Sequence, residues 1–282
     1  MSSGSGTLAE YLRARRGQLR PEDAGFPADP RRRLSGLRRS EVAELAGIST
    51  EYYTRLEQGR TYQLSDSVLR GLAAALQLDE SASTYFYRIA LPAPPQLRVP
   101  PHTAVSDLIV RIVDEWSEFP VYVADRNMDL LLSNDLALAM FPDVLSASGN
   151  VLESVFLTSP DGRAGAGWKL VAENAVAALR FQSDPADPRL HEIVGGLSVR
   201  DTEFRRMWAN HSAEPLRSGT APVVVDGLGR GEIPWQALGV PGGHTMIVYV
   251  ASPGTFAARA VEHLKRRIEE ATVVAASDRH AK

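Results

Sequence analysis

The sequence contains no cysteine, almost no lysine and no apolar run long enough to cross a bilayer. Without cysteine it can form neither disulfides nor thiolate metal sites, and it has no thiol nucleophile. A membrane-spanning helix needs about 18 or more apolar residues, and the N-terminal MSSGSG lacks the basic and then apolar profile of a secretory signal. We therefore expect a cytoplasmic protein with no membrane partner.

Motifs of catalysis and metal binding are also missing. The six histidines show no HxxxH or HExxH spacing. The chain has no GxSxG and no SxxK, and its glycine-rich stretch GLGRG (227–231) matches neither GxGxxG nor a phosphate-binding loop. That stretch lies between strand-like runs and is better explained as a hairpin turn. We expect no metal, no cofactor and no enzymatic activity.

The composition is that of a folded protein with two domains. Of 282 residues, 44% are apolar and 23% are charged, which excludes disorder for most of the chain. The segment PAPPQLRVPP (92–101) is rich in proline and reads as a semi-rigid spacer. It divides the chain into predicted domains at 1–91 and 102–282.

Positive charge is concentrated near the N-terminus. Between Arg13 and Arg39 there are nine arginines and three acidic residues, a local excess of six positive charges (9 − 3 = 6). This arginine-rich stretch is typical of a surface that meets a polyanion.

The N-terminal domain reads as five short helices, at about 8–16, 40–46, 50–58, 65–76 and 84–91. Leu8, Tyr11 and Leu12 share one face of the first helix. Ser40 is the expected N-cap of the second, whose apolar positions are Val42, Leu45 and Ala46. Ser65 begins the fourth.

The segment LRRSEVAELAGISTEYYTRLEQGR (37–60) has the spacing of a helix-turn-helix pair. Gly47 is suited to the turn, Ser49 to capping the second helix and Ala43 to close packing. In that geometry Tyr53 and Leu56 point inward. The residues expected to face DNA bases are Thr50, Glu51, Tyr52 and Arg55, and those expected to hold phosphates are Arg31, Arg32, Arg33, Arg38, Arg39, Gln58 and Arg60.

The second domain has a mixed α+β pattern. Strand-like runs occur at 121–125, 129–134, 221–226 and 246–251, and helical patterns at 105–116, 136–141, 169–181, 189–197, 203–211 and 257–271. In the last helix Val261, Leu264 and Ile268 recur on one face.

The helix-turn-helix segment resembles the lambda-repressor-like family. The basic insertion before STEYYTRLEQGR resembles the MmyB-like branch of bacterial transcription regulators. SNDLALAMFPD (133–143), DPRLHEIVGGLSVRDTEFRRMWANH (187–211) and VYVASPG (248–254) are similar to that branch's ligand-binding domain. The resemblance implies a PAS-like domain with an apolar cavity, associated with a fatty acid in some members. VVVDGLGRGEI (223–233) departs from the family pattern, so the resemblance implies no ligand role for that stretch.

Large apolar side chains of the second domain serve either as ordinary core or as the wall of a ligand cavity. The candidate wall residues are Tyr122, Leu130, Leu132, Trp168, Phe204, Trp208 and Tyr249. Arg205 and Arg206 beside Trp208 are either a cation for a carboxylate head group or solvated surface charges.

Together these features predict a sequence-specific DNA-binding regulator, with an all-α helix-turn-helix domain followed by an α+β PAS-like sensory domain. Its expected partners are a double-stranded DNA operator and a small apolar, fatty-acid-like ligand. A homodimer is expected because one short helix reads few base pairs. The alternative is a lipid-binding protein or an enzyme whose N-terminal helices dock a protein partner.

Overall fold

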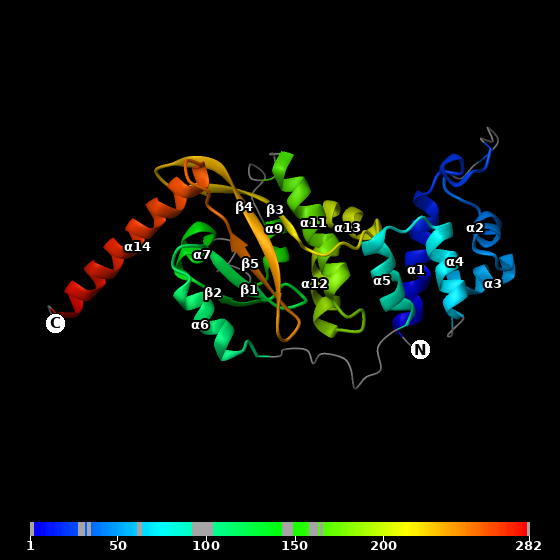
Figure 1. The fold of residues 1–282 in the computed structure, drawn as a ribbon, viewed down its shortest axis with the longest axis horizontal. Helices are drawn as coiled ribbons and strands as arrows, with labels where there is room; N and C mark the ends of the chain where they lie inside the picture. Colours follow the sequence, from blue (N-terminus) through cyan, green and yellow to red (C-terminus); the bar gives the residue numbers. More distant parts are fainter. Residues whose placement is uncertain are drawn as a thin grey trace. The chain divides into compact units, whose positions relative to one another are not determined.

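The chain forms two compact units (Figure 1). The first contains Met1–Arg98, Val176–Val194 and Ser198–Pro215, and the second contains Val99–Ala175, Gly195–Leu197 and Leu216–Lys282. The spacer predicted at 92–101 lies outside the described residues, so that boundary stays a prediction. The computed structural model describes residues 3–27, 32, 35–60, 64–91, 104–142, 149–157, 163 and 166–280.

Among the described residues, five α-helices build the N-terminal part of the first unit, as the sequence predicts. They are α1 (Ser3–Gln18), α2 (Arg39–Ala46), α3 (Thr50–Glu57), α4 (Asp66–Ala75) and α5 (Glu80–Ala90), with a short 3-10 helix η1 (Glu22–Ala24) after α1. The expected inward positions are confirmed, since Tyr11, Leu12 and Tyr53 are at most 1% exposed. These side chains pack together in a single apolar core.

Of the two predicted helix caps, Ser49 is confirmed and Ser40 is not. The Oγ of Ser49 accepts the Tyr52 amide at 3.1 Å, and Ser65 caps α4 in the same way. Ser40 does not cap α2, because α2 begins at Arg39 and its N-cap residue is Arg38. Glu41 caps it instead by accepting the Arg38 backbone N–H at 2.6 Å.

A five-stranded antiparallel sheet with the order β2-β1-β5-β4-β3 forms the centre of the second unit. Tyr122 pairs with Ile247, and Trp235 pairs with Tyr249. The strands are β1 (Val121–Ala124), β2 (Leu130–Ser133), β3 (Ser218–Val225), β4 (Gly229–Val240) and β5 (His244–Tyr249). Helices followed by an α+β domain confirm the predicted fold class.

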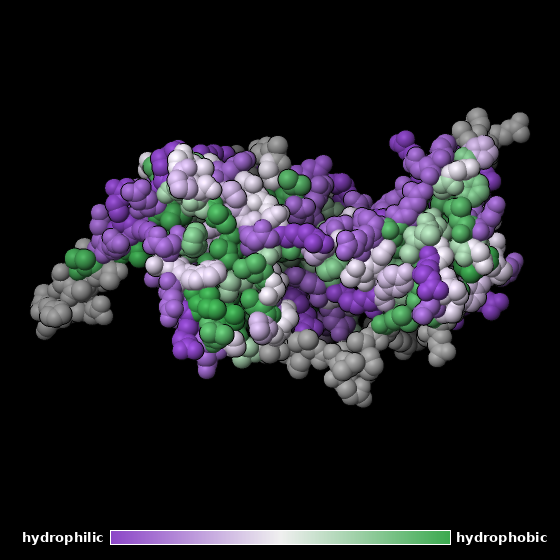
Figure 2. All heavy atoms as spheres, in the orientation of Figure 1, coloured by the Kyte–Doolittle hydropathy of each residue, from purple (hydrophilic) through white to green (hydrophobic). Residues whose placement is uncertain are grey.

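The two faces of this sheet carry different apolar clusters. On one face Tyr122, Ile247 and Tyr249 pack against α7 (Asp135–Met140) and the first half of α14 (Phe256–His280). On the other face β1 and β5 pack against α6 (Asp107–Glu115), through Ile109 and Val113. The second half of α14 runs clear of the sheet (Figure 1). Apolar residues also gather at the surface over β2, α6 and α7 (Figure 2). Each of these elements carries an exposed leucine, Leu131 in β2, Leu108 in α6 and Leu138 in α7.

Helices α9 (Val151–Leu157), α11 (Ala166–Gln182), α12 (Pro188–Arg200) and α13 (Thr202–Ala209) also lie between β2 and β3. Helix α9 belongs to the second unit, and α13 to the first. Helices α11 and α12 have residues in both units. The chain therefore enters the first unit a second time after the sheet has begun.

The glycines of the β3–β4 hairpin have two separate roles. Gly227 and Gly229 have φ of +85° and +87°, which confirms the predicted hairpin turn. Gly231 lies within β4, where an added Cβ would come within 2.1 Å of a ring carbon of Phe256. Glycine at that position lets α14 approach the strand closely.

Candidate DNA-binding surface and ligand-binding domain

The turn between α2 and α3 has the predicted helix-turn-helix geometry. Gly47 ends α2 with φ of +67°, a left-handed conformation that glycine adopts without strain. Ala43 is 1% exposed between the helices. Sequence reasoning missed Gly71 of α4, where an added Cβ would be 2.5 Å from the Ala46 carbonyl oxygen. Close packing of α4 on the end of α2 therefore supports the turn.

Helix α3 has a buried face and an exposed face. Tyr53, Leu56 and Glu57 are buried, whereas Thr50, Glu51 and Arg55 are exposed. Tyr52 differs from these three candidate base readers because its ring is partly buried against the helical core. The exposed face of α3 thus presents a hydroxyl, a carboxylate and a guanidinium, groups able to bind base edges.

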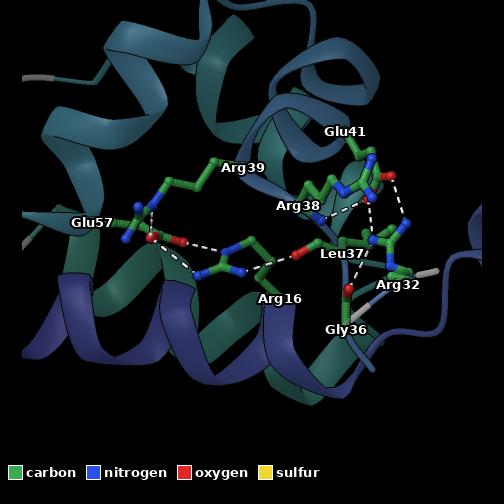
Figure 3. A network of polar contacts seen from close by, with 8 residues as sticks. All are labelled: Arg16, Arg32, Gly36, Leu37, Arg38, Arg39, Glu41 and Glu57. Atoms are coloured by element: carbon green, nitrogen blue, oxygen red, sulfur yellow. Dashed lines mark hydrogen bonds and ion pairs between the residues drawn. The ribbon is translucent and has the colours of Figure 1, made fainter. Parts of the chain in front are cut away.

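A buried carboxylate connects three helices beneath this surface (Figure 3). Glu57 of α3 accepts hydrogen bonds from Nε of Arg16 in α1 at 2.5 Å and from Nε of Arg39 in α2 at 2.7 Å. The Glu57 side chain is fully buried, and that of Arg16 is 15% exposed. Burial alone would raise the pKa of Glu57, but the hydrogen bonds and charge of the arginines outweigh it and lower that pKa. Glu57 therefore stays ionised and fixes α3 against α1 and α2.

Arg39 was predicted to hold phosphate, and the structure gives it an internal partner as well. Its side chain is 48% exposed while its Nε binds Glu57. A guanidinium has five N–H donors, so Arg39 keeps donors available for a phosphate.

Arg32 is placed differently from the prediction. Its guanidinium binds both carboxylate oxygens of Glu41, at 2.7 and 2.5 Å, and the carbonyl oxygen of Gly36 at 2.8 Å. Its side chain is 9% exposed, and this hydrogen bonding lowers the pKa of Glu41. Arg32 positions the start of α2, an arrangement that does not favour a phosphate contact.

The remaining phosphate candidates lie around the two helices. Arg38 precedes α2 and is exposed, as are Gln58 and Arg60 after α3. Arg31 and Arg33 lie outside the described residues.

Three predicted ligand-wall residues come together on the α7 and α14 side of the sheet. Tyr122 and Tyr249 are each 7% exposed, with ring centroids 6.2 Å apart, and Leu130 packs against the same cluster. Burial raises the pKa of both tyrosines. The neighbouring hydroxyl partly offsets this rise at Tyr122 and adds to it at Tyr249. Their hydroxyls are polar groups within an apolar cluster, the kind of anchor that orients a ligand.

The other four wall residues lie elsewhere. Leu132 packs in the cluster on the opposite face of the sheet. Trp168 packs edge-on against Phe156 and donates its indole N–H to the Val155 carbonyl oxygen at 2.9 Å. Phe204 and Trp208 stack on each other in the first unit. The structure therefore does not gather all seven residues into one wall.

Arg205 and Arg206, the alternative cations for a head group, are exposed on α13. Arg206 pairs with Glu203 one turn away at 2.8 Å, and Arg205 bonds Thr202 at 3.3 Å. Of the two alternatives that the sequence allowed, this arrangement matches solvated surface charges. The buried cation of this region is Arg180, which sequence reasoning missed and which is 6% exposed.

The helix pair, its buried ion-pair network and the separate sheet together define the class: a helix-turn-helix DNA-binding protein with a second, α+β domain. Comparison with family models supports both parts. Residues 7–83 match a helix-turn-helix domain, and residues 105–264 match the MmyB-like transcription regulator ligand binding domain. Because the second match covers more than half of the chain, the chain belongs to the MmyB-like transcription regulators. A search of curated proteins finds no match.

Two further observations describe the part of the chain that the structure covers. No helix there is both long and apolar enough to cross a membrane. No group of three or more histidine, aspartate or glutamate side chains there is arranged to hold a metal ion.

Proposed function

We propose that this regulator reads its operator with the exposed face of α3 in the major groove. The observation that carries the proposal is the sharp division of α3, with Thr50, Glu51 and Arg55 exposed and Tyr53 and Leu56 in the core. A recognition helix contacts base edges through its N-terminal residues. Tyr52, partly buried, would contribute the edge of its ring.

Arg38, Arg39, Gln58 and Arg60 then hold phosphates on either side of the recognition helix. They lie at the start of α2 and after α3, which are positions that flank the groove in this docking geometry. Phosphate contacts fix the register but carry no sequence information. Arg32 is left out of this set because Glu41 holds it.

Arginine substitutions on two duplexes test this assignment. Arg55→Ala is expected to weaken binding to the operator by about 1–3 kcal/mol and to leave binding to a random duplex nearly unchanged. The matched substitution Arg60→Ala is expected to weaken both duplexes alike. An equal loss on both duplexes for Arg55→Ala would remove it from the groove.

The protein acts as a homodimer in this proposal. One short recognition helix reads few base pairs, and a two-fold protein on a palindromic site doubles the contacts. Mass measurement by light scattering, alone and with a single operator duplex, tests it. One chain per full operator would contradict the dimer. Bacterial DNA lies in the cytoplasm, so a bacterial regulator that binds DNA is expected there.

The ligand of the second domain is proposed to be an elongated apolar molecule with an acidic head, such as a fatty acid. Supporting this are the two buried tyrosine hydroxyls of Tyr122 and Tyr249 inside the apolar cluster. A carboxylate can accept hydrogen bonds from both hydroxyls, and burial of each methylene contributes about 0.8 kcal/mol.

Tryptophan fluorescence offers a direct assay, because Trp235 pairs with Tyr249 across the sheet and packs against this cluster. Saturated fatty acids of increasing length are expected to bind roughly fourfold tighter per methylene until the site is full. Trp235→Phe is expected to reduce the signal, and Trp208→Phe in the first unit to preserve it.

If no chain length saturates the signal and no small molecule co-purifies, the aromatic cluster is ordinary core. Turnover of a lipid without any DNA binding would instead support the alternative of an enzyme or lipid-binding protein. The regulator proposal predicts no turnover.

A further inference from the structure

The first unit contains a segment that belongs by sequence to the ligand-binding domain. The family match to that domain spans residues 105–264, yet residues 176–194 and 198–215 pack in one unit with the helix-turn-helix region. We call these two stretches the bridging helices. Helix α11 starts at Ala166 in the second unit and ends at Gln182 in the first. A continuous α-helix of 17 residues is about 25 Å long (1.5 Å per residue).

Apolar contacts join the bridging helices to the helical core. Ala213 is 4% exposed and belongs to the cluster that contains Tyr11, Tyr85 and Phe86. Phe181, near the end of α11, packs against the same cluster. The buried faces of α1 and α5 are therefore covered in part by residues from the ligand-binding sequence.

Polar contacts join the same elements. Nε2 of Gln18 in α1 donates to the Asn210 carbonyl oxygen at 2.6 Å, and Arg88 of α5 donates to the Arg180 carbonyl oxygen at 3.2 Å. The Arg88 guanidinium also lies 5.3 Å from the ring centroid of Tyr85 and 5.5 Å from that of Phe181. Arg88 is thus placed between one ring of α5 and one ring of α11.

Next to the Arg88 contact, the buried side chain of Arg180 joins α11 to α13 and the residues that follow it. Its guanidinium lies 3.7 Å from the ring centroid of Trp208, donates to the Trp208 carbonyl oxygen and binds Nδ1 of His211 at 3.2 Å. Burial lowers the pKa of Arg180 and the proximity of the Tyr85 hydroxyl opposes that change. His211 is neutral in this contact, since burial and the neighbouring Arg180 and Arg13 lower its pKa to about 4.

A buried cation held by neutral groups is stable only where the helices keep those groups in place. Positions of the helices partway through a movement leave the cation buried without its partners and are therefore higher in free energy. If α11 shifts relative to α13, the guanidinium loses the Trp208 ring and the His211 nitrogen while still buried, which is costly. The contact is therefore expected to be either closed, or open with Arg180 in water. Two discrete arrangements are what coupling between sites requires.

We propose that the contact of α1 and α5 with the bridging helices is the joint through which the ligand-binding domain controls DNA binding. The proposal rests on the function proposed above. Helix α11 provides the physical connection, because its two ends belong to different units. A change in the second domain that moves α11 acts directly on Arg180 and Phe181, and through them on α5.

Cross-linking of the full chain tests the joint, and the absence of native cysteine makes this simple. Gln18 and Asn210 are both exposed, so Gln18→Cys and Asn210→Cys together can be bridged by a short bis-maleimide. The control pair is Asp23→Cys with Gln77→Cys, which lies wholly within the N-terminal helices and is also joined by a hydrogen bond, at 2.8 Å.

Operator duplex recovered from genomic DNA with the wild-type chain serves as the probe. Locking the joint is expected to change the dissociation constant for this duplex by a factor within about 5–150, the usual range of coupling between sites. The control cross-link is expected to change it less than twofold. A locked joint with unchanged affinity, or a folded double variant that does not cross-link, would overturn the proposal.

A second measurement separates this result from failure of the proposed function. If the wild-type chain binds no DNA, both proposals fail together. If it binds and the lock has no effect, the joint alone fails.

Hydrogen exchange in the full chain also tests whether the joint exists in solution. Arg180→Met is expected to speed exchange in α5 and the end of α1 at least tenfold, and the exposed Arg70→Met to leave both unchanged. Unchanged exchange in α5 for Arg180→Met would show that the joint is not formed.

Discussion

Replacing Glu57 by glutamine is expected to loosen the whole helix-turn-helix region. The substitution removes the negative charge that holds Arg16 and Arg39 and leaves one amide oxygen as an acceptor. Loss of one partner from a buried ion pair costs about 3–5 kcal/mol. Because Arg16 is nearly buried and glutamine still accepts one hydrogen bond, we expect about 3 kcal/mol for Glu57→Gln.

The two arginines contribute unequally to this free energy. The Arg39 side chain is 48% exposed, so its contact with Glu57 is screened by water and is worth about 0–1 kcal/mol. Arg39→Met is therefore expected to leave stability nearly unchanged while weakening binding to every DNA sequence. Arg16→Met is expected to destabilise the region by an amount close to that of Glu57→Gln.

Hydrogen exchange of peptides from α1 and α3 measures this effect locally, without assuming that both units unfold together. A loss of about 3 kcal/mol corresponds to roughly a hundredfold faster exchange of the most protected amides. Glu51→Gln on the exposed face of α3 is the matched control and is expected to leave exchange unchanged. The reasoning is refuted if Glu57→Gln exchanges within threefold of wild type, or if Arg39→Met is equally damaging.

Three further predictions concern packing, pH and salt. Gly71→Ala is expected to lower the melting temperature, since overpacking against the Ala46 carbonyl costs about 1–3 kcal/mol and helix propensity returns at most about 1; Gly17→Ala, with open space around it, is the control. The folded pKa of His211 lies at about 4, below its usual 6.5, so the unfolded state binds the extra proton and stability falls as pH drops from about 6.5 to about 4. Denaturant unfolding at several pH values is expected to show less of this loss for His211→Asn, which keeps a residue tolerant of the positive φ, and equal losses would contradict the assignment. Finally, if a dimer neutralises roughly six to eight phosphates, the logarithm of the DNA association constant plotted against log salt is expected to slope at about −5 to −7, and a flat plot would exclude phosphate contacts.

Local rules predicted the helix-turn-helix segment well because its signals lie close together in sequence. Gly47 and Ser49 act within one turn of their own helices, and Tyr53 and Leu56 follow the helical period. When apolar residues lie on both sides of a helix, the helical period does not show which side is buried. Leu45, one of the three apolar positions expected in the second helix, is 41% exposed.

The sheet shows where sequence patterns are insufficient. Strand β4 was not predicted, because Gly231, Pro234 and Gly239 all disfavour a strand in isolation. Pairing with β3 on one side and β5 on the other forms it nevertheless. Likewise, Leu132 was grouped with Tyr122, although β1 and β2 direct these two side chains to opposite faces.

The ion pairs beneath the DNA-binding surface could be predicted only in part. Glu57 lies three residues after Thr54 and four residues after Tyr53, so it falls on the inward face of α3. That spacing is a signal in the sequence that Glu57 is buried. Its partner Arg16 is 41 residues away in sequence. No local pattern connects the two, so arginines that look alike in sequence acquire different roles in the fold.

The repeated passage of the chain between the two units has a practical consequence for dissecting the protein. Protease cleavage within PAPPQLRVPP (92–101) cuts the peptide between the family matches, yet residues 176–194 and 198–215 would still pack with the helices of the N-terminal fragment. Cleavage there is expected to yield a nicked protein that stays associated until denatured. A recombinant fragment that stops at the spacer would expose the apolar side chains that Phe181 and Ala213 normally cover, so its solubility and DNA affinity would misrepresent the intact regulator.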